Sequence, residues 1–306
     1  MNRGEDYVVE THRPSGRHRR KLGQAFAFTM ALVLAFALAY NFIFAGGNPL
    51  MPGDNEIIVA FLDVGQGDSI LIRSRDNAVL IDGGDINRNE PVLGYLRRMG
   101  ITRLDYVIAT HPHRDHIGGL IPVLNRVDVG RVLMPDVVHT TDVFENFISV
   151  IENNHIAAHA PVPGERFIAG IIDFTVLSPA HSFAGSNLND ASIVVRLDHG
   201  MTSFLFTGDA EAGSERAMLA GRQDLRADVI KIGHHGSRTS TTEAFLDAVQ
   251  PVAAVISVGG SNRFGHPHAD VLARLNYRGI QILRTDEMGT IVMATDGEQV
   301  VLLPAS

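Results

Sequence analysis

Cysteine is absent from all 306 residues of this chain. Its absence excludes disulfide bonds, thiolate metal ligands and cysteine nucleophiles, so any metal must be held by His, Asp, Glu or Asn side chains. Cysteine usage does not indicate a compartment, because a chain without thiols is compatible with either redox environment. With 45% hydrophobic residues and 30 glycines, the sequence predicts one extended, loop-rich α/β domain.

Positive charge is scarce beyond the N-terminus. Residues 1–21 hold six of the 26 Lys and Arg residues and three of the 34 acids, which leaves 20 basic and 31 acidic side chains, a formal charge of −11. Such an acidic body lacks the broad cationic field that drives non-specific nucleic-acid binding, although a local groove or bound metals could still attract phosphate. Tight, sequence-independent DNA binding is therefore not expected.

A long apolar run lies near the N-terminus. Residues 25–44 carry no charge and are long enough to cross a membrane as a helix. Basic residues precede the run and none follows between 45 and 61, so the positive-inside rule predicts a cytoplasmic N-terminus. We expect a basic cytoplasmic tail at 1–24, a plasma-membrane anchor at 25–44, a linker at 45–55 and an extracytoplasmic domain at 56–306. The alternatives are a buried core helix and a signal peptide cleaved near Ala37-Leu38-Ala39.

Short apolar runs beyond the linker predict the fold class. The strands come first as hairpins and later alternate with helices, which predicts an α/β fold of two face-to-face sheets with helices outside, an αββα sandwich. Strands are predicted at residues 57–62, 69–72, 78–81, 105–109, 131–134, 172–177, 192–197, 203–206, 228–232, 253–258, 280–283 and 289–294. Helices are predicted at residues 91–99, 142–153, 210–220, 242–249 and 268–277.

Three histidines and one aspartate fall within six residues after the strand predicted at 105–109. A tight turn there could aim His111 and His113 at one cation and Asp115 with His116 at a second. Imidazole nitrogen and carboxylate oxygen both suit zinc or manganese. The segment therefore predicts a centre for two divalent metal ions rather than a polar loop that happens to be rich in histidine.

Further polar groups follow other predicted strands. Asp209 could bridge two metals, although alone it would be read as the cap of the helix that follows. The adjacent His234 and His235 are flanked by glycines, and we rank His234 first as a further ligand with His235 close behind. Asn189 or Asp190 could also reach the metals, but turn formation explains them equally well.

Three more segments are candidates for supporting roles. His266 and His268 precede a predicted helix, where they could hold a phosphate oxygen or protonate a leaving group, or simply belong to a surface loop. Residues 63–68 read as a hairpin turn whose glycines allow unusual backbone angles. Asp82 ends a strand and could orient a ligand histidine from behind.

These motifs together resemble the metallo-β-lactamase superfamily, whose H-x-H-x-D-H signature is matched by His111, His113, Asp115 and His116. More closely, residues 63–68, 82–84, 207–209, 234–237 and 265–268 resemble the metallo-β-lactamase-like domain of ComEC competence proteins. The resemblance covers residues 56–295. It implies an αββα sandwich with a metal site at one edge, and its ComEC branch is associated with DNA uptake and proposed nuclease activity.

The chain departs from these families in two ways. The superfamily often has another histidine ligand before the position of Asp209, whereas this chain offers Asn187, Asn189 and Asp190. ComEC proteins also carry a many-helix channel region, whereas this chain has one predicted span. We therefore expect a separate channel protein as a partner if the chain acts in DNA translocation.

The resulting hypothesis is a membrane-anchored, metal-dependent phosphodiesterase or nuclease acting on single-stranded DNA. His111 and His113 would bind the first metal, Asp115, His116 and His234 or His235 would bind the second, and Asp209 would bridge the two. A second hypothesis is hydrolysis of another ester, amide, lactone or envelope phosphodiester by the same centre. A third, of a different class, is a non-catalytic surface module that binds nucleic acid or envelope polymer through a degenerate site.

Overall fold

The computed structural model describes residues 51–179 and 187–304. Within these ranges no helix combines the length and the apolar character that a membrane span requires. The predicted tail, the anchor or signal peptide at 25–44 and the first residues of the linker lie outside the described residues.

The first sheet has eight strands in the order β15-β14-β1-β2-β3-β4-β5-β6. Neighbouring strands are antiparallel from β15 to β3 and parallel from β3 to β6. Every residue of β1, β2 and β3 is buried, which agrees with their continuous apolar sequences. The strands are β1 Ile57–Phe61, β2 Ile70–Arg73, β3 Ala78–Ile81, β4 Arg103–Ile108, β5 Asp128–Leu133, β6 Ala157–His159, β14 Ile291–Thr295 and β15 Val300–Leu302.

The second sheet has seven strands in the order β13-β12-β11-β10-β9-β8-β7. It is antiparallel from β7 to β10 and parallel from β10 to β13, so each sheet has an antiparallel half and a parallel half in its strand order. The strands are β7 Arg166–Ala169, β8 Ile172–Ser178, β9 Val194–His199, β10 Thr202–Phe206, β11 Val229–Lys231, β12 Ala253–Ile256 and β13 Gln281–Arg284.

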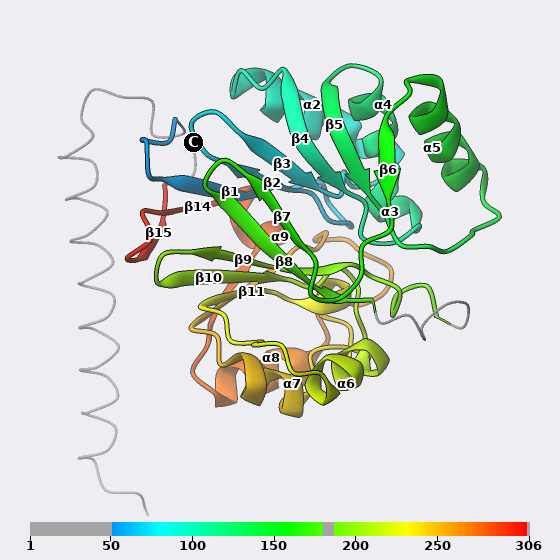
Figure 1. The fold of residues 1–306 in the computed structure, drawn as a ribbon. Coiled ribbons are helices and arrows are strands. Elements are labelled where there is room, and N and C mark those ends of the chain that lie inside the picture. Colours follow the sequence, from blue (N-terminus) through cyan, green and yellow to red (C-terminus); the bar gives the residue numbers. More distant parts are fainter. Residues whose placement is uncertain (1–50, 180–186, 305–306) are drawn as a thin grey trace, which may run out of the picture. The chain divides into compact units, whose positions relative to one another are not determined.

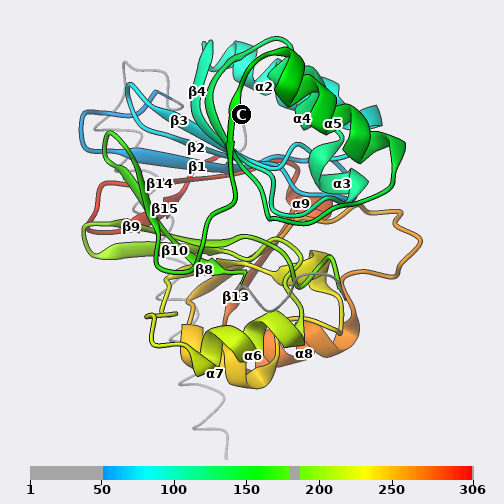
Figure 2. The same ribbon diagram turned by 45° about the vertical axis from the view of Figure 1, so that its right-hand side comes forward.

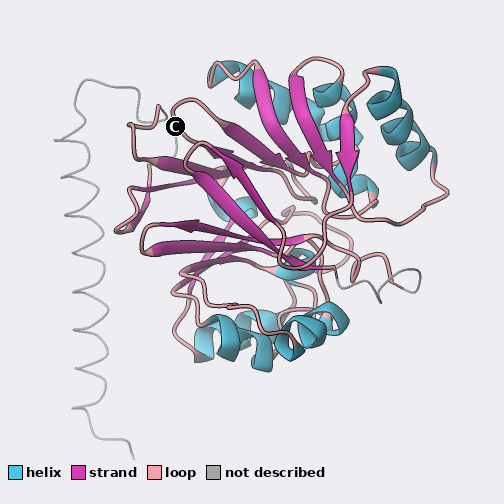
Figure 3. Cartoon of the chain, in the orientation of Figure 1, coloured by secondary structure: helices cyan, strands magenta, loops and turns pink. Residues whose placement is uncertain are grey.

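The two sheets pack face to face, and helices cover their outer faces (Figure 1, Figure 3). A core of side chains from both sheets fills the space between them, with the Phe61 and Phe206 rings 6.1 Å apart. A second core joins the second sheet to α6, α7 and α8. The turned view shows the same layers, with α2, α4 and α5 on the first sheet (Figure 2). The helices are α2 Asn89–Arg98, α3 Arg114–Ile117, α4 Leu120–Leu124, α5 Asp142–Asn153, α6 Ala212–Ala220, α7 Glu243–Val249, α8 Ala269–Tyr277 and α9 Thr285–Met288, with 3₁₀ turns η1 Ile86–Arg88 and η3 Gly233–Gly236.

The predicted four-layer α/β sandwich is confirmed, and each predicted strand and helix has a counterpart. The prediction missed β6, β7 and β15, which have only three or four residues each and are too short for a strand pattern to be recognised. It also missed α3, α4 and α9, each of at most five residues. The helix predicted from residue 210 begins at Ala212, because Ala210 and Glu211 still belong to the turn that follows β10.

The polar strand ends meet at one edge of the sandwich. Asp82 follows β3 and the histidine cluster follows β4, both in the first sheet. Asp209 follows β10, and His234 with His235 follow β11, both in the second sheet. In open α/β sheets, ligands bind outside the carboxyl ends of parallel strands, and both sheets here present such ends to the same place.

Candidate metal centre

Asp209 lies at the centre of a cluster of four imidazoles. Its Oδ2 atom lies 3.8 Å from His111 Nε2, 3.3 Å from His116 Nε2, 3.8 Å from His234 Nε2 and 3.5 Å from His235 Nε2. The carboxylate itself is buried, and its backbone N–H donates to the hydroxyl of Ser192. Four nitrogens therefore converge on one carboxylate that comes from the opposite sheet to His111 and His116.

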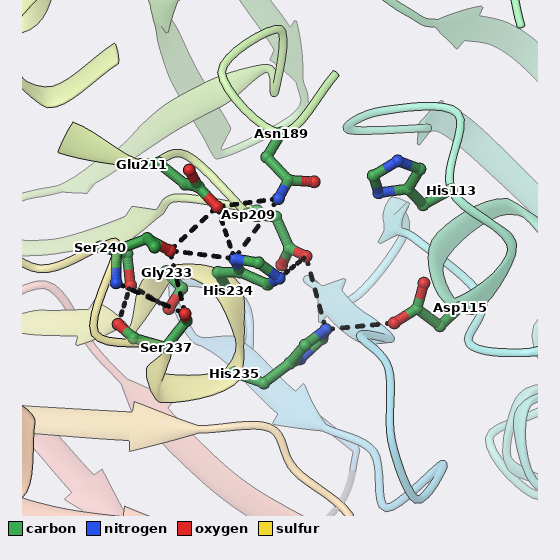
Figure 4. A network of polar contacts seen from close by, with 12 residues as sticks. His113, Asp115, Asn189, Asp209, Glu211, Gly233, His234, His235, Ser237 and Ser240 are labelled. Atoms are coloured by element: carbon green, nitrogen blue, oxygen red, sulfur yellow. Dashed lines mark hydrogen bonds and ion pairs between the residues drawn. The ribbon is translucent and has the colours of Figure 1, made fainter. Parts of the chain in front are cut away.

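The Nδ1 atom of each of these histidines is bound elsewhere. His116 Nδ1 donates to Asp82 Oδ2 at 2.8 Å, and His235 Nδ1 donates to the carbonyl oxygen of Ser257 at 3.0 Å. His234 Nδ1 donates to Glu211 Oε1 at 2.8 Å (Figure 4). A carboxylate or carbonyl oxygen can only accept, so each neutral ring carries its proton on Nδ1 and can offer the lone pair of Nε2 to a cation, as in metal sites of proteins.

The tautomer of His111 follows from a chain of hydrogen bonds. The Thr110 hydroxyl donates to Asp82 Oδ2 at 2.7 Å, so it accepts from His111 Nδ1 at 3.1 Å. Asp82 thereby fixes His116 directly and His111 through Thr110, and it also accepts the Thr110 backbone N–H at 2.8 Å. The structure thus gives Asp82 the orienting contact that its position at a strand end suggested.

The remaining members of the H-x-H-x-D-H segment lie at the rim of the cluster. His113 precedes α3, is half-buried, and its Nδ1 lies 3.0 Å from His111 Nε2. Asp115 sits in the first turn of α3, and its Oδ2 lies 3.3 Å from His235 Nε2. The short helix therefore carries both Asp115 and His116 toward His235, where ligand atoms of the three residues lie within 4.8 Å of one another.

Two overlapping sets of donors could each hold a cation. Ligand atoms of His111, His116 and Asp209 all lie within 4.8 Å of one another, and so do those of Asp115, His116 and His235. His235 is buried and belongs to the second set, whereas His234 is partly exposed and belongs to neither. The geometry therefore favours His235 over His234, the reverse of the order expected from the sequence.

Glu211 holds His234 and the asparagines of the preceding segment. Its carboxylate accepts from Asn189 Nδ2 at 3.0 Å (Figure 4). It also accepts from Asn187 Nδ2 at 3.1 Å and from the Thr239 hydroxyl at 2.9 Å. Asp190 instead accepts the backbone N–H groups of Glu211 and Ser214, so it serves the turn before α6. Of the three residues considered for the missing histidine, Asn189 therefore lies nearest to a ring of the cluster, with Nδ2 3.4 Å from His234 Nδ1.

A buried ion pair lies behind the cluster, and sequence reasoning gave neither partner a role. Lys231 Nζ contacts Asp68 Oδ2, donates to the Gly208 carbonyl oxygen at 2.8 Å and lies 3.8 Å from Asp209 Oδ1. Both side chains are almost completely buried. The signal in the sequence was a lysine at the end of an otherwise apolar strand, which is costly to bury without a partner.

His266 and His268 lie beside the cluster in the loop that precedes α8. The His266 ring centroid is 5.4 Å from that of His234 and 4.9 Å from that of His268. His268 Nδ1 accepts the backbone N–H of Arg238 at 3.1 Å, so this ring holds the loop that follows His235. Within the described ranges His266 borders the centre and His268 stands one ring further out.

The donor atoms of the cluster fit divalent cations. His116 Nε2, His235 Nε2 and one oxygen each of Asp209 and Asn189 are buried and have no hydrogen-bond partner among the described residues. Buried polar atoms are rarely left unpaired, and a shared ligand explains such a group. Imidazole nitrogens and carboxylate oxygens from a preorganised shell are the donors that zinc or manganese binds.

Without a cation, the charges of the cluster shift the pKa values strongly. Burial opposes charge on His235, but Asp209, Asp115 and Asp68 raise its pKa to about 10. Burial also opposes charge on His116, yet Asp209 and Asp82 raise its pKa well above the usual value. Burial and the neighbouring His116 instead lower the pKa of His111. Without a cation, His235 and His116 therefore carry the positive charge that a metal ion would otherwise supply to the cluster.

The fold and this cluster define a metallo-hydrolase. Residues 62–260 match the metallo-beta-lactamase superfamily, and the chain belongs to this superfamily, a metal-dependent hydrolase fold that implies divalent metal binding. Among solved structures, the metallo-beta-lactamase fold protein YhfI from Bacillus subtilis has a TM-score of 0.51 at 15% identity and covers 74% of this chain and 95% of that chain. This likeness concerns the fold.

Within this superfamily, the chain is similar in sequence to proteins of competence systems. "ComE operon protein 3" of Bacillus subtilis is 33% identical over 261 residues, which are 79% of this chain and 33% of that protein. "Competence protein ComA" of Neisseria gonorrhoeae is 31% identical over 253 residues, which are 81% of this chain and 34% of that protein. The resemblance to competence proteins is confirmed, and the chain spans about one third of the length of these relatives.

Proposed function

We propose that this chain is a membrane-anchored, extracytoplasmic phosphodiesterase that hydrolyses single-stranded DNA with two divalent cations, zinc or manganese. The observation that carries the proposal is the convergence of four Nε2 atoms on Asp209 Oδ2, each ring being held at its other nitrogen or, for His111, through Thr110. Such a shell is preorganised for cations rather than for packing.

The roles of the residues follow from their contacts. His111, His113 and Asp209 would hold one cation, and Asp115, His116 and His235 the other, with Asp209 between them. When bound, the two cations would lower the pKa of a water and neutralise the charge that develops on a phosphodiester. His266, beside His234, would face the phosphate or the leaving oxygen.

Two features support a DNA substrate. Two relatives bear the names of a ComE operon protein and a competence protein. Arg238, whose backbone N–H donates to His268, and Arg263, which lies over the Phe264 ring, are both exposed and could attract phosphate to an otherwise acidic body. For translocation we propose a separate channel protein as the partner.

The direct test uses the full chain and its His111→Ala variant. We expect about two metals per wild-type chain and cleavage of a labelled single-stranded oligonucleotide that depends on manganese or zinc and is lost in the variant. His155→Asn is the matched control, because His155 is exposed and lies after α5. Bound metal without DNA cleavage would contradict the nuclease and redirect the search to envelope esters. A wild-type chain without metal would favour a non-catalytic binding module.

A further inference from the structure

An exposed aromatic side chain lies in the loop between β12 and α8. Phe264 is 51% exposed, in a segment where the neighbouring Arg263 and Gly265 are exposed as well. Single exposed apolar residues are common and need no explanation by themselves. Phe264 differs because the loop around it is ordered and leads into the metal centre.

Asn262 holds the loop in place with its side-chain amide. Its Nδ2 donates to the carbonyl oxygens of Gly259 and His266, both at 2.7 Å. Its Oδ1 accepts the backbone N–H of His266 at 2.9 Å and that of Phe264 at 3.2 Å. Four hydrogen bonds from one side chain fix the backbone on both sides of Phe264, so its ring is positioned before any ligand arrives.

A series of ring contacts connects Phe264 with the candidate metal centre. The Phe264 and His266 rings stack with centroids 5.7 Å apart and an interplanar angle of 25°. His266 in turn lies 5.4 Å from His234 and 6.4 Å from His235. A molecule that rests on Phe264 would therefore extend toward Asp209 with His266 between the two.

Unpaired positive charge surrounds the same loop. The Arg263 guanidinium lies over the Phe264 ring, 5.0 Å from its centroid. Arg238 lies beside His268, which accepts its backbone N–H. Neither guanidinium has a carboxylate partner among the described residues, whereas Arg278 and Arg284 nearby along the chain both do. The free Arg263 guanidinium next to an exposed aromatic ring suits a ligand that has both phosphates and flat rings.

We propose that Phe264 is a stacking platform for a nucleobase of the strand whose phosphodiester lies at the metal centre, and that Arg263 contacts the adjacent phosphate. The proposal rests on the proposed function and adds a base-binding subsite to it. Stacking on an aromatic side chain tolerates every base, because each base has a π face, so the subsite would favour single strands without reading their sequence. A paired base has both faces covered in the duplex and would not use it.

The test compares variants of the full chain for binding a fluorescein-labelled oligothymidine and an abasic strand of equal length. Binding is measured by fluorescence anisotropy with manganese present and with strands whose phosphorothioate linkages resist cleavage. Manganese-dependent cleavage of unmodified strands is measured separately. Phe264→Ala should bind oligothymidine about 5- to 100-fold more weakly, whereas Phe264→Trp should bind at least as tightly as wild type. Tyr277→Ala is the matched control, because Tyr277 is an aromatic residue that is 89% exposed at the end of α8.

The abasic strand separates stacking from phosphate contacts. Wild type and Phe264→Ala should bind the abasic strand equally, whereas Arg263→Gln should bind both strands more weakly than wild type. Equal affinity of wild type and Phe264→Ala for oligothymidine would overturn the platform even if the wild type cleaves DNA. Aromatic-dependent binding without cleavage would support the platform and contradict the nuclease, and a wild type that neither binds nor cleaves would overturn both.

Discussion

The exchange of Asp82 for asparagine tests whether the hydrogen bonds behind the candidate ligand His116 control its ability to bind a cation. Asp82 accepts hydrogen bonds from the Thr110 backbone, the Thr110 hydroxyl and His116 Nδ1, and its side chain is completely buried. In the variant an amide NH₂ replaces the oxygen that accepts from His116. Asparagine tolerates the left-handed backbone at this position, where φ is 55°, so the backbone should be kept.

The variant leaves His116 two arrangements, and both weaken a cation site. If Nδ1 keeps its proton, it faces the amide NH₂ as an unpaired buried donor, at a cost of about 1–3 kcal/mol. If the proton moves to Nε2, the lone pair that faces Asp209 is lost. Either way we expect metal affinity to fall about 10- to 100-fold, the range seen when the partners of ligand histidines are removed.

The assay is competition with a chromophoric chelator at pH 8, together with thermal denaturation with and without metal. Asp85→Asn is the matched control, because Asp85 lies three residues further along and its carboxylate makes only exposed contacts. It accepts the backbone N–H of Asn87 and pairs with the exposed Arg114, an ion pair worth at most about 1 kcal/mol. Unchanged metal affinity in Asp82→Asn, or an equal loss in Asp85→Asn, would refute the view that Asp82 sets the tautomer of His116.

Four further predictions concern the cluster and its support. His235→Ala should reduce metal content and activity more than His234→Ala, as measured by metal analysis and turnover, because only His235 belongs to a compact donor set; a larger loss in His234→Ala would contradict this. Metal binding should release protons, and metal affinity should rise from pH 6.5 toward pH 10, because the pKa of His235 is raised from 6.5 to about 10 and that of His116 is also raised. Calorimetry in buffers of different ionisation enthalpy counts the released protons. Without metal, the stability that protonated His235 contributes should be complete below pH 6.5 and disappear as the pH rises through about 10, which urea denaturation would show. Gly119→Ala should destabilise the fold by about 1–3 kcal/mol, because the added Cβ would overlap the Gly83 carbonyl oxygen. The control Gly94→Ala in α2 should instead increase the free energy of unfolding by about 0.5–1 kcal/mol. Equal melting temperatures of the two variants would contradict the steric argument.

Periodicity was sufficient for the long elements and failed for the short ones. The apolar runs of β1 and β12 are buried throughout, so their sequences alone indicate strands. The strand β6 has two exposed alanines and is recognisable only through its pairing with β5, which is a long-range contact. The same limit applies to α3, whose four residues form a helix because the histidine cluster must turn between β4 and α4.

The sequence predicted the candidate ligands that lie together in one segment. It did not predict contacts between residues that are far apart in the sequence. The H-x-H-x-D-H segment lies together in the sequence, and the structure places its four members around the cluster. The order of His234 and His235 depends on their backbones, both with positive φ, and on Glu211 and Ser257, which no local pattern relates to them. Lys231 and Asp68 lie far apart in the sequence, so their ion pair could be found only in three dimensions.

The division of the donors between the two sheets has a mechanical consequence. His111 and His116 are carried by the first sheet, and Asp209 and His235 by the second, so a cation in the cluster would cross-link the sandwich at that edge. This cross-link would stabilise the folded chain by about 2.7 kcal/mol for each cation that is present at one hundred times its dissociation constant. Chelation should therefore open this edge first, and amide hydrogen exchange near β4 and β11 would rise before exchange in β1 and β9, where His199 still joins the sheets through the Asn55 carbonyl.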